Sequence, residues 1–237
     1  TGERRVNALR SSLVFLWMVL SIIPFGTGLL VSSLFLPSAK LWHWFAIPWL
    51  RGVIAAARLV GGVDYVVRGE ENLPDAADMQ RVILVPKHQS TWETFFLPSA
   101  MPHLVSYVFK KELLQIPVFG WCMARLEMVH IDRGKWIVMF PEGTRSQRGS
   151  QGVYKVGASR LAVDTGAVLI PIAMSSGRCW PRKSFWFVPG CVEVSIGEPI
   201  APEGRTPEDL MAEVENWIEG EMRRIDPEAY KETQTRA

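Results

Sequence analysis

The chain has 237 residues, 48% of them hydrophobic, which is enough to bury one substantial core. Its formal net charge of +2 at pH 7 is too small to attract a nucleic acid by bulk electrostatics, so no nucleic-acid partner is expected. Cys122, Cys179 and Cys191 lie far apart and form no CxxC pair, which argues against a disulfide framework and indicates a reduced, cytosolic environment.

The first predicted element is a long apolar segment. No charged residue lies between Arg10 and Lys40, and residues 13–36 are apolar almost throughout. About 20 helical residues cross the hydrocarbon core of a bilayer, so residues 1–62 are expected to form a membrane-binding helical segment. The apolar stretch is too long for a signal peptide, and no Ala-x-Ala cleavage site follows it.

Two arrangements of this segment are open. Pro24, Gly26 and Gly28 interrupt its middle, where a helical hairpin would bend. Basic residues flank both ends, so the positive-inside bias does not orient a single crossing; they are Arg4, Arg5, Arg10, Lys40, Arg51 and Arg58. A hairpin that dips into one leaflet keeps both ends on the cytosolic side and is favoured, with a single transmembrane helix as the alternative.

The tryptophan-rich stretch that follows is typical of a surface-lying element. Trp42, Trp44 and Trp49 favour the membrane interface, while Arg51 and Arg58 share one helical face. The tryptophans are therefore expected to anchor the chain at the interface, and the rim of a substrate tunnel is the alternative.

Residues 63–237 are predicted to form an α/β domain. Short apolar runs, rich in β-branched residues, predict strands at 63–69, 81–86, 103–109, 127–131, 136–140, 167–174 and 191–197. Helices are expected at 91–100, 118–126 and 155–165. The pattern indicates a largely buried mixed sheet flanked by helices.

The last helix has a distinct N-terminal signal. Thr206 can cap it, and Pro207 suits its first turn. An apolar stripe follows and is expected to pack in the core; it consists of Leu210, Val214, Trp217, Ile218 and Ile225.

One junction is unusually short. Only residues 132–135 separate the predicted strands 127–131 and 136–140. Parallel strands need a crossover of about a dozen residues or more. We therefore expect that a helical segment after Lys135 is missing from this chain.

The first candidate site is the stretch PKHQSTWETFF, which follows the strand 81–86. His88 and Glu93 could form a proton-transfer pair. Equally, His88 could be a structural histidine, and Glu93 could close a capping box with Ser90. By themselves these residues leave both interpretations open.

The second candidate site is FPEGTRS, residues 140–146, which follows the strand 136–140. Ligands of open α/β sheets bind beyond the carboxyl ends of strands, so the two sites can converge. Gly143 permits close approach of the backbone, and the planar guanidinium of Arg145 suits a phosphate. A tight turn with an exposed arginine is the structural alternative.

Four motifs in this order resemble the glycerolipid acyltransferase family, most of all its lysophosphatidic acid acyltransferases. The first, histidine-x4-aspartate, is similar to His88 and Glu93, with glutamate replacing aspartate. The third, FPEGTR, is intact. The second is similar to KKELLQIPVFGW followed by IDRGK, the fourth to VLIPIAM around Pro171, and a basic-glycine element to YKVGAS. The resemblance covers about residues 63–225.

The resemblance implies transfer of a fatty acyl group from a thioester, acyl-CoA or acyl-carrier protein, to the free hydroxyl of 1-acyl-glycerol-3-phosphate, giving phosphatidic acid. His88 would be the general base, held by Glu93. The expected substrate-binding residues are Arg145, Glu142, Gly143, Thr144, Lys111, Arg133 and Lys155. Whether Glu142 orients the hydroxyl or braces its own turn is left open.

No cofactor is expected besides the acyl donor as co-substrate, and no metal, because the four histidines lack ligand spacing. The expected partners are membrane lipids, lysophosphatidic acid and the donor, at the inner or cytoplasmic membrane with the catalytic domain on the cytosolic side. The alternatives are another lysophospholipid acyltransferase or transacylase, and a non-catalytic membrane lipid-binding protein.

Overall fold

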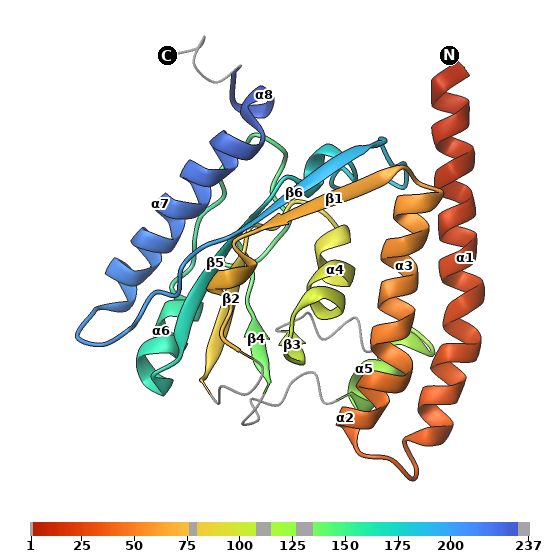
Figure 1. Ribbon diagram of the computed structural model, residues 1–237, viewed down its shortest axis with the longest axis horizontal. Coiled ribbons are helices and arrows are strands. Elements are labelled where there is room, and N and C mark those ends of the chain that lie inside the picture. The colour runs from red at the N-terminus through yellow and green to blue at the C-terminus, as the bar shows by residue number, and fades with distance from the viewer. Residues whose placement is uncertain (1, 76–79, 108–114, 127–134, 232–237) are drawn as a thin grey trace.

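A mixed six-stranded sheet forms the centre of the molecule, in a computed structural model that describes residues 2–75, 80–107, 115–126 and 135–231 (Figure 1). Its strand order is β1-β6-β5-β2-β4-β3. The strands are β1 Val63–Arg68, β2 Val82–Pro86, β3 Val105–Tyr107, β4 Trp136–Val138, β5 Val168–Met174 and β6 Gly190–Ile196. β5 and β6 pair antiparallel, whereas the other described pairs are parallel. The predicted fold class, a largely buried mixed sheet, is confirmed.

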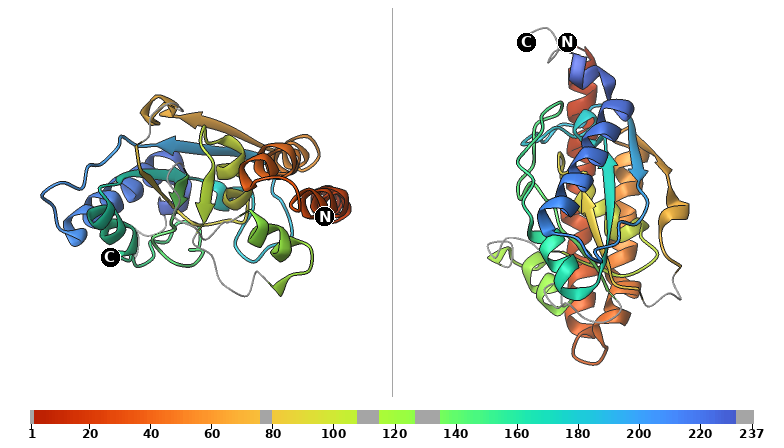
Figure 2. Two further views of the ribbon diagram at one scale, coloured as in Figure 1. Left: turned by 90° about the horizontal axis from the view of Figure 1, so that it is seen from below. Right: turned by 90° about the vertical axis from the view of Figure 1, so that its left-hand side faces the viewer.

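Helices cover both faces of this sheet (Figures 1 and 2). α6 (Gly157–Thr165) and α7 (Pro207–Ile225) pack on one face, and α4 (Trp92–Ala100) lies on the other beside α3 (Ile47–Leu59). The short elements are α5 (Phe119–Arg125), α8 (Pro227–Tyr230) and the 3₁₀ turns η2 (Glu70–Asn72) and η4 (Ser176–Arg178). The predicted helices all exist, with small shifts at their ends.

β2 shows why its all-apolar sequence forms a central strand. Val82 and Leu84 pack in the core on the α4 side, while Ile83 and Val85 pack in the core beneath α6 and α7. Successive side chains of a strand point to opposite faces, so a strand covered on both faces must be apolar at every position.

α7 begins and packs as predicted. The Thr206 hydroxyl accepts a hydrogen bond from the backbone N–H of Asp209 at 3.1 Å. Its stripe lies against the sheet: Leu210, Val214, Ile218 and Ile225 are buried, and Trp217 is partly buried.

The N-terminal segment departs from the predicted bend. α1 (Gly2–Ser32) runs straight through Pro24, and the chain turns back only after Ser32. A Cβ on Gly26 would lie 2.5 Å from Val118 Cγ1, and one on Gly28 would lie 2.7 Å from Phe45 Cε1. These two glycines therefore allow neighbouring segments to approach α1 closely. The prediction that the helix bends there is wrong, because tertiary packing uses the glycines for close contact.

The returning chain forms α2 (Ser38–Leu41), a π-helical turn η1 (Trp42–Ala46) and α3, which packs along α1. Trp44 is 60% exposed, but Trp42 and Trp49 are buried. The indole N–H of Trp42 donates to the Leu126 carbonyl at 3.2 Å, and that of Trp49 donates to Ser21 Oγ at 3.0 Å. Since both indoles find internal partners, the interfacial role predicted for Trp42 and Trp49 is wrong.

α1 is long and apolar enough to cross a membrane and is a candidate membrane element. One hydrophobic core nevertheless joins α1 and α3 to the sheet, since it contains Val14, Leu29, Val53 and Leu84. The predicted division at residues 62 and 63 stays a prediction. The predicted strand 127–131 and residues 132–134 of the short junction lie outside the described residues, so the expectation of a missing helical segment after Lys135 stays a prediction.

Candidate active site

The two sequence clusters meet at the carboxyl ends of adjacent strands. β2 leads into PKHQS, and β4 leads into FPEGTR. β2 and β4 pair in parallel, so both clusters leave the sheet at the same edge. The backbone N–H of Ser146 donates to the His88 carbonyl at 2.7 Å, which ties the clusters together.

His88 and Glu93 form a hydrogen-bonded pair. His88 Nδ1 lies 2.5 Å from Glu93 Oε2, and the imidazole stacks on the Phe140 ring with centroids 3.7 Å apart. An ionised carboxylate can only accept, so we assign the imidazole proton to Nδ1. Nε2 is then left with its lone pair, as a general base requires.

Glu93 also organises the start of α4. Its Oε1 accepts from the backbone N–H groups of Gln89 at 2.8 Å and Ser90 at 2.9 Å, and from the Ser176 hydroxyl. The Ser90 hydroxyl accepts from Trp92 N at 3.1 Å, where α4 begins. The two interpretations of Glu93 are therefore compatible, because one oxygen contacts His88 while the other closes the turn.

A buried ionic cluster lies directly behind His88. Lys87 is fully buried, and its ammonium group contacts Glu142 Oε1 at 2.9 Å, Glu219 Oε1 at 2.6 Å and the Ser150 carbonyl at 3.2 Å. The Tyr154 hydroxyl donates to Glu219 Oε1 at 2.9 Å. Burial, and then the negative charge of Glu219, raises the pKa of Tyr154 well above its usual value, which keeps the hydroxyl a donor.

The contacts of Glu142 favour the bracing role. Its side chain is buried and accepts hydrogen bonds from Lys87, from the N–H groups of His88 at 3.3 Å and Gly152 at 3.0 Å, and from Ser146 Oγ at 3.2 Å. With both oxygens engaged and the side chain outside the cavity described below, Glu142 is poorly placed to contact a substrate.

Arg145 shares a cavity with His88. Arg145 Nη1 donates to Thr91 Oγ1 at 2.6 Å, and both residues line the cavity together with Gly143 and Thr144. Gly143 has φ of +66°, which favours glycine, and its N–H donates to the Phe140 carbonyl at 3.1 Å.

Two further candidates are placed differently. A Cβ on Gly143 would lie 3.0 Å from Lys155 Nζ, so Lys155 brings a second cation to this turn. Lys111 and Arg133, the other predicted phosphate ligands, lie outside the described residues.

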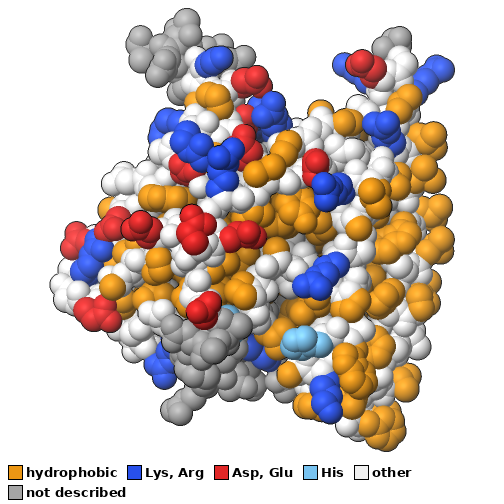
Figure 3. All heavy atoms as spheres, viewed as in Figure 1, with side chains coloured by type: hydrophobic (Ala, Val, Ile, Leu, Met, Phe, Trp, Pro, Cys, Tyr) orange, Lys and Arg blue, Asp and Glu red, His pale blue; other side chains and the backbone are white. Residues whose placement is uncertain are grey.

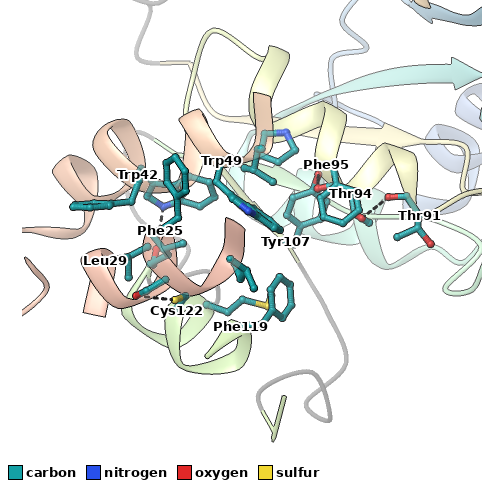
Figure 4. A pocket seen from close by; sticks show the side chains of 18 of the residues that line it. Phe25, Leu29, Trp42, Trp49, Thr91, Thr94, Phe95, Tyr107, Phe119 and Cys122 are labelled. Atoms are coloured by element: carbon teal, nitrogen blue, oxygen red, sulfur yellow. Dashed lines mark hydrogen bonds between the residues drawn. The ribbon is translucent and has the colours of Figure 1, made fainter. Parts of the chain in front are cut away.

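The cavity has a volume of about 950 Å³ and is mostly apolar (Figure 4). Its polar wall carries His88, Thr91, Thr144 and Arg145. Its apolar wall comes from α1, η1, α3, α4 and α5, and includes Phe25, Leu29, Trp42, Trp49, Phe95 and Phe119. Burial, with a further contribution from Glu93, raises the pKa of Tyr107 at the cavity wall, so its phenol stays protonated.

Several residues of this arrangement were not predicted, and three of them come from distant parts of the chain. Lys87 directly follows β2, Ser176 lies in η4 and Glu219 lies in α7, far apart in the chain. The sequence held a signal for Lys87 and for Glu219. Lys87 is a charged residue directly after a strand that is apolar throughout, and Glu219 is an acidic residue next to the buried stripe of α7. Ser176 carries no comparable pattern. Within the described ranges, no group of three or more His, Cys, Asp or Glu side chains could hold a metal ion.

Comparison with known proteins identifies the family of this chain. The family model described as "Acyltransferase" matches residues 64–175. The 1-acyl-sn-glycerol-3-phosphate acyltransferase of Pseudomonas aeruginosa is 35% identical and covers 94% of this chain and 93% of its own length. The yeast enzyme of the same name is 29% identical over 70% of this chain and 60% of its own length.

A solved structure supports the fold. The crystal structure of the 1-acyl-sn-glycerophosphate acyltransferase of Thermotoga maritima matches with a TM-score of 0.78, at 23% identity, over 94% of this chain and 97% of its own. The fold, together with a relative that matches over nearly the whole chain, makes this protein a glycerolipid acyltransferase. The chain belongs to this acyltransferase family, and within it to the 1-acyl-sn-glycerol-3-phosphate acyltransferases.

Proposed function

We propose that the enzyme acylates the free hydroxyl of 1-acyl-glycerol-3-phosphate from a thioester donor and so forms phosphatidic acid. The observation that carries this proposal is the shared cavity: His88, paired with Glu93, and Arg145 line the same apolar space. The names of the relatives support the choice of acceptor, since the chain and the Pseudomonas aeruginosa enzyme match over nearly their whole lengths.

His88 is proposed as the general base. Nε2 takes the proton from the acceptor hydroxyl as its oxygen attacks the thioester carbonyl carbon. The tetrahedral intermediate then collapses, the C–S bond breaks, and the imidazolium returns the proton to the departing thiolate. Glu93 keeps the proton on Nδ1 and stabilises the imidazolium, while base assistance of this kind contributes about 10²–10⁴ in rate.

The cations at the FPEGTR turn are proposed to bind the acceptor phosphate. The Arg145 guanidinium offers a planar pair of donors, and Lys155 adds a point charge beside Gly143. The apolar wall of the cavity has the composition expected for a fatty acyl chain. Acyl-CoA and acyl-carrier protein are both compatible with a donor that approaches from solution.

We further propose that the enzyme acts at the inner or cytoplasmic membrane with its catalytic domain on the cytosolic side. α1 packs along the domain through Val14 and Leu29, so it lies against the protein instead of projecting away from it. This packing favours a hairpin in one leaflet over a single crossing. Labels on the N-terminus and on the domain that react from opposite sides of a sealed membrane would contradict it.

The decisive assay uses reconstituted enzyme with lysophosphatidate and each thioester donor in turn. His88→Ala should lower kcat by at least about 10²-fold while the variant keeps its thermal stability. Full activity in a folded His88→Ala variant would remove the base assignment and with it the proposed mechanism.

The acceptor is tested separately. The assay compares lysolipids that differ only in the head group. With the wild-type enzyme, loss of the phosphate should raise KM. With Arg145→Gln, the difference in KM between the phosphorylated and the neutral lysolipid should largely disappear. If a neutral head group serves equally well with the wild-type enzyme, a different lysophospholipid acyltransferase activity is favoured and the phosphate role of Arg145 is wrong.

A further inference from the structure

The loop of residues 181–189, between η4 and β6, exposes large apolar side chains. Phe185 is 71% exposed, Trp186 is 53% exposed and Val188 is 47% exposed. Aromatic side chains that point into water in adjacent positions are unfavourable unless a partner covers them. The catalytic proposal gives this loop no role.

The loop is held firmly despite its exposure. Between the two exposed aromatic residues and Val188 lies Phe187, which is buried, stacks on Phe15 of α1 with centroids 5.8 Å apart and meets Trp180 at 4.5 Å. Its backbone N–H donates to the buried Ser11 hydroxyl of α1 at 2.8 Å. Ser184 Oγ accepts from the Trp186 N–H at 2.9 Å. Phe185 and Trp186 are therefore presented outward by a structured loop fixed to α1.

The same loop borders the outward face of α1. Phe185 contacts Phe15 edge to face, with centroids 5.8 Å apart. Many large apolar side chains of α1 are exposed, including Trp17, Val19 and Val31. Six more recur every three or four residues and so form one apolar stripe; they are Val6, Leu9, Leu13, Leu16, Leu20 and Ile23. Hydrophobic side chains cover the α1 edge of the molecule in Figure 3, whereas charges are denser over α7. The loop and α1 thus form neighbouring parts of one apolar surface.

Basic residues lie beside the exposed aromatic pair. Arg182 and Lys183 are both exposed, as are Arg4, Arg5 and Arg10 near the start of α1. No acidic residue occurs between Arg178 and Glu193. Aromatic side chains next to exposed cations match the layered chemistry of a bilayer with anionic head groups, in which rings enter the interface and cations remain at the phosphates.

We propose that the 181–189 loop is a second bilayer contact, which the catalytic domain itself supplies beside the contact made by α1. Phe185 and Trp186 enter the interfacial region, and Arg182 and Lys183 bind anionic lipid head groups. Since Phe187 and Ser11 join the loop to α1, the two contacts fix the orientation of the domain on the membrane. A protein partner is disfavoured because the patch continues the apolar face of a candidate membrane helix.

A fluorescent depth probe tests the insertion directly. Phe185→Cys, made together with Cys191→Ser, carries an environment-sensitive label, while Cys122 and Cys179 are buried. The emission should shift to the blue when the full chain binds phosphatidylcholine–phosphatidylglycerol vesicles, and a quencher attached to lipid should reduce it. The matched control is Val153→Cys in the same background, since Val153 is 81% exposed in the segment that precedes α6, and it should change little.

Two results would overturn the proposal. One is a label at position 185 that stays in water when the protein is bound to vesicles. The other is a blue shift that depends on protein concentration without vesicles, which would identify a protein contact at this loop. Neither measurement uses enzymatic activity, so the outcome is independent of the proposed reaction.

The proposed binding of anionic head groups by Arg182 and Lys183 has its own test. Replacing Arg182 and Lys183 by Gln should weaken binding to phosphatidylglycerol-containing vesicles by roughly fivefold for each charge, and should leave binding to pure phosphatidylcholine unchanged. Arg160→Gln on the exposed side of α6 is the control and should have no effect. An equal loss on both vesicle types, or none on either, would contradict head-group recognition.

Discussion

Two regions on either side of His88 are built in opposite ways. Behind it, Lys87, Glu142 and Glu219 form a buried ionic cluster in which each N–H of the ammonium group has an acceptor. In front of it lies an apolar cavity of about 950 Å³. A buried charge needs partners at defined positions, so the first region holds the geometry, whereas the second leaves room for a flexible chain.

The difference predicts how each region responds to substitution. Changes behind His88 should act on stability or on turnover, because they alter the support of the imidazole and the FPEGTR turn. Changes in the part of the cavity wall that α1, η1 and α3 supply should act on the choice of acyl chain, because these side chains lie away from His88 and Arg145 in the fold.

The largest effect is expected for Lys87→Met. Removing the ammonium group leaves Glu142 and Glu219 as buried, uncompensated carboxylates, which should lower the free energy of unfolding by about 3–5 kcal/mol. Denaturant unfolding measures this. Adding Glu142→Gln and Glu219→Gln to Lys87→Met should recover part of the loss. If Lys87→Met alone is neutral, the cluster does not hold this region together.

Ser176→Ala should act on turnover. The Ser176 hydroxyl donates to the same carboxylate that holds His88, and a hydrogen bond to a charged group contributes about 1.5–3 kcal/mol. We therefore expect kcat to fall by about 10–100-fold with KM for lysophosphatidate unchanged. Steady-state kinetics separates the two constants, and Ser176→Thr, which keeps the hydroxyl, should recover much of the rate. A change confined to KM would contradict this positioning role.

Ile22→Phe should act on acyl-chain choice alone. Ile22 lines the cavity from α1, so a larger ring there takes up space. Each methylene that no longer fits loses about 0.8 kcal/mol of transfer free energy, or about fourfold in relative kcat/KM against a shorter chain. Competition between thioesters of different length measures this ratio. Val153→Phe, outside the cavity, is the control, and an equal loss at all chain lengths would argue against an acyl-chain site.

Thr206→Ala should give the smallest effect and involve neither region. Loss of the cap on Asp209 N should cost about 1 kcal/mol of stability, seen in thermal unfolding, with kcat unchanged. A marked loss of activity would mean that the start of α7 is coupled to the site through Glu219.

The sequence by itself determined the features that depend on near neighbours. The alternation of apolar runs and helical segments predicted the α/β fold, and the signals around Thr206 located the start of α7. The spacing of His88 and Glu93 likewise allowed a local hydrogen bond, because His88 lies just before α4 and Glu93 lies in its first turn.

Only the tertiary structure decided the rest. Lys87 meets Glu219 across 132 positions, and Ser176 meets Glu93 across 83. Pro24 lies in a straight helix, and Trp42 and Trp49 turn into the cavity wall. Spacing along a chain restricts contacts only within a turn or two. Which distant side chains become partners depends on how the helices and strands pack around the sheet.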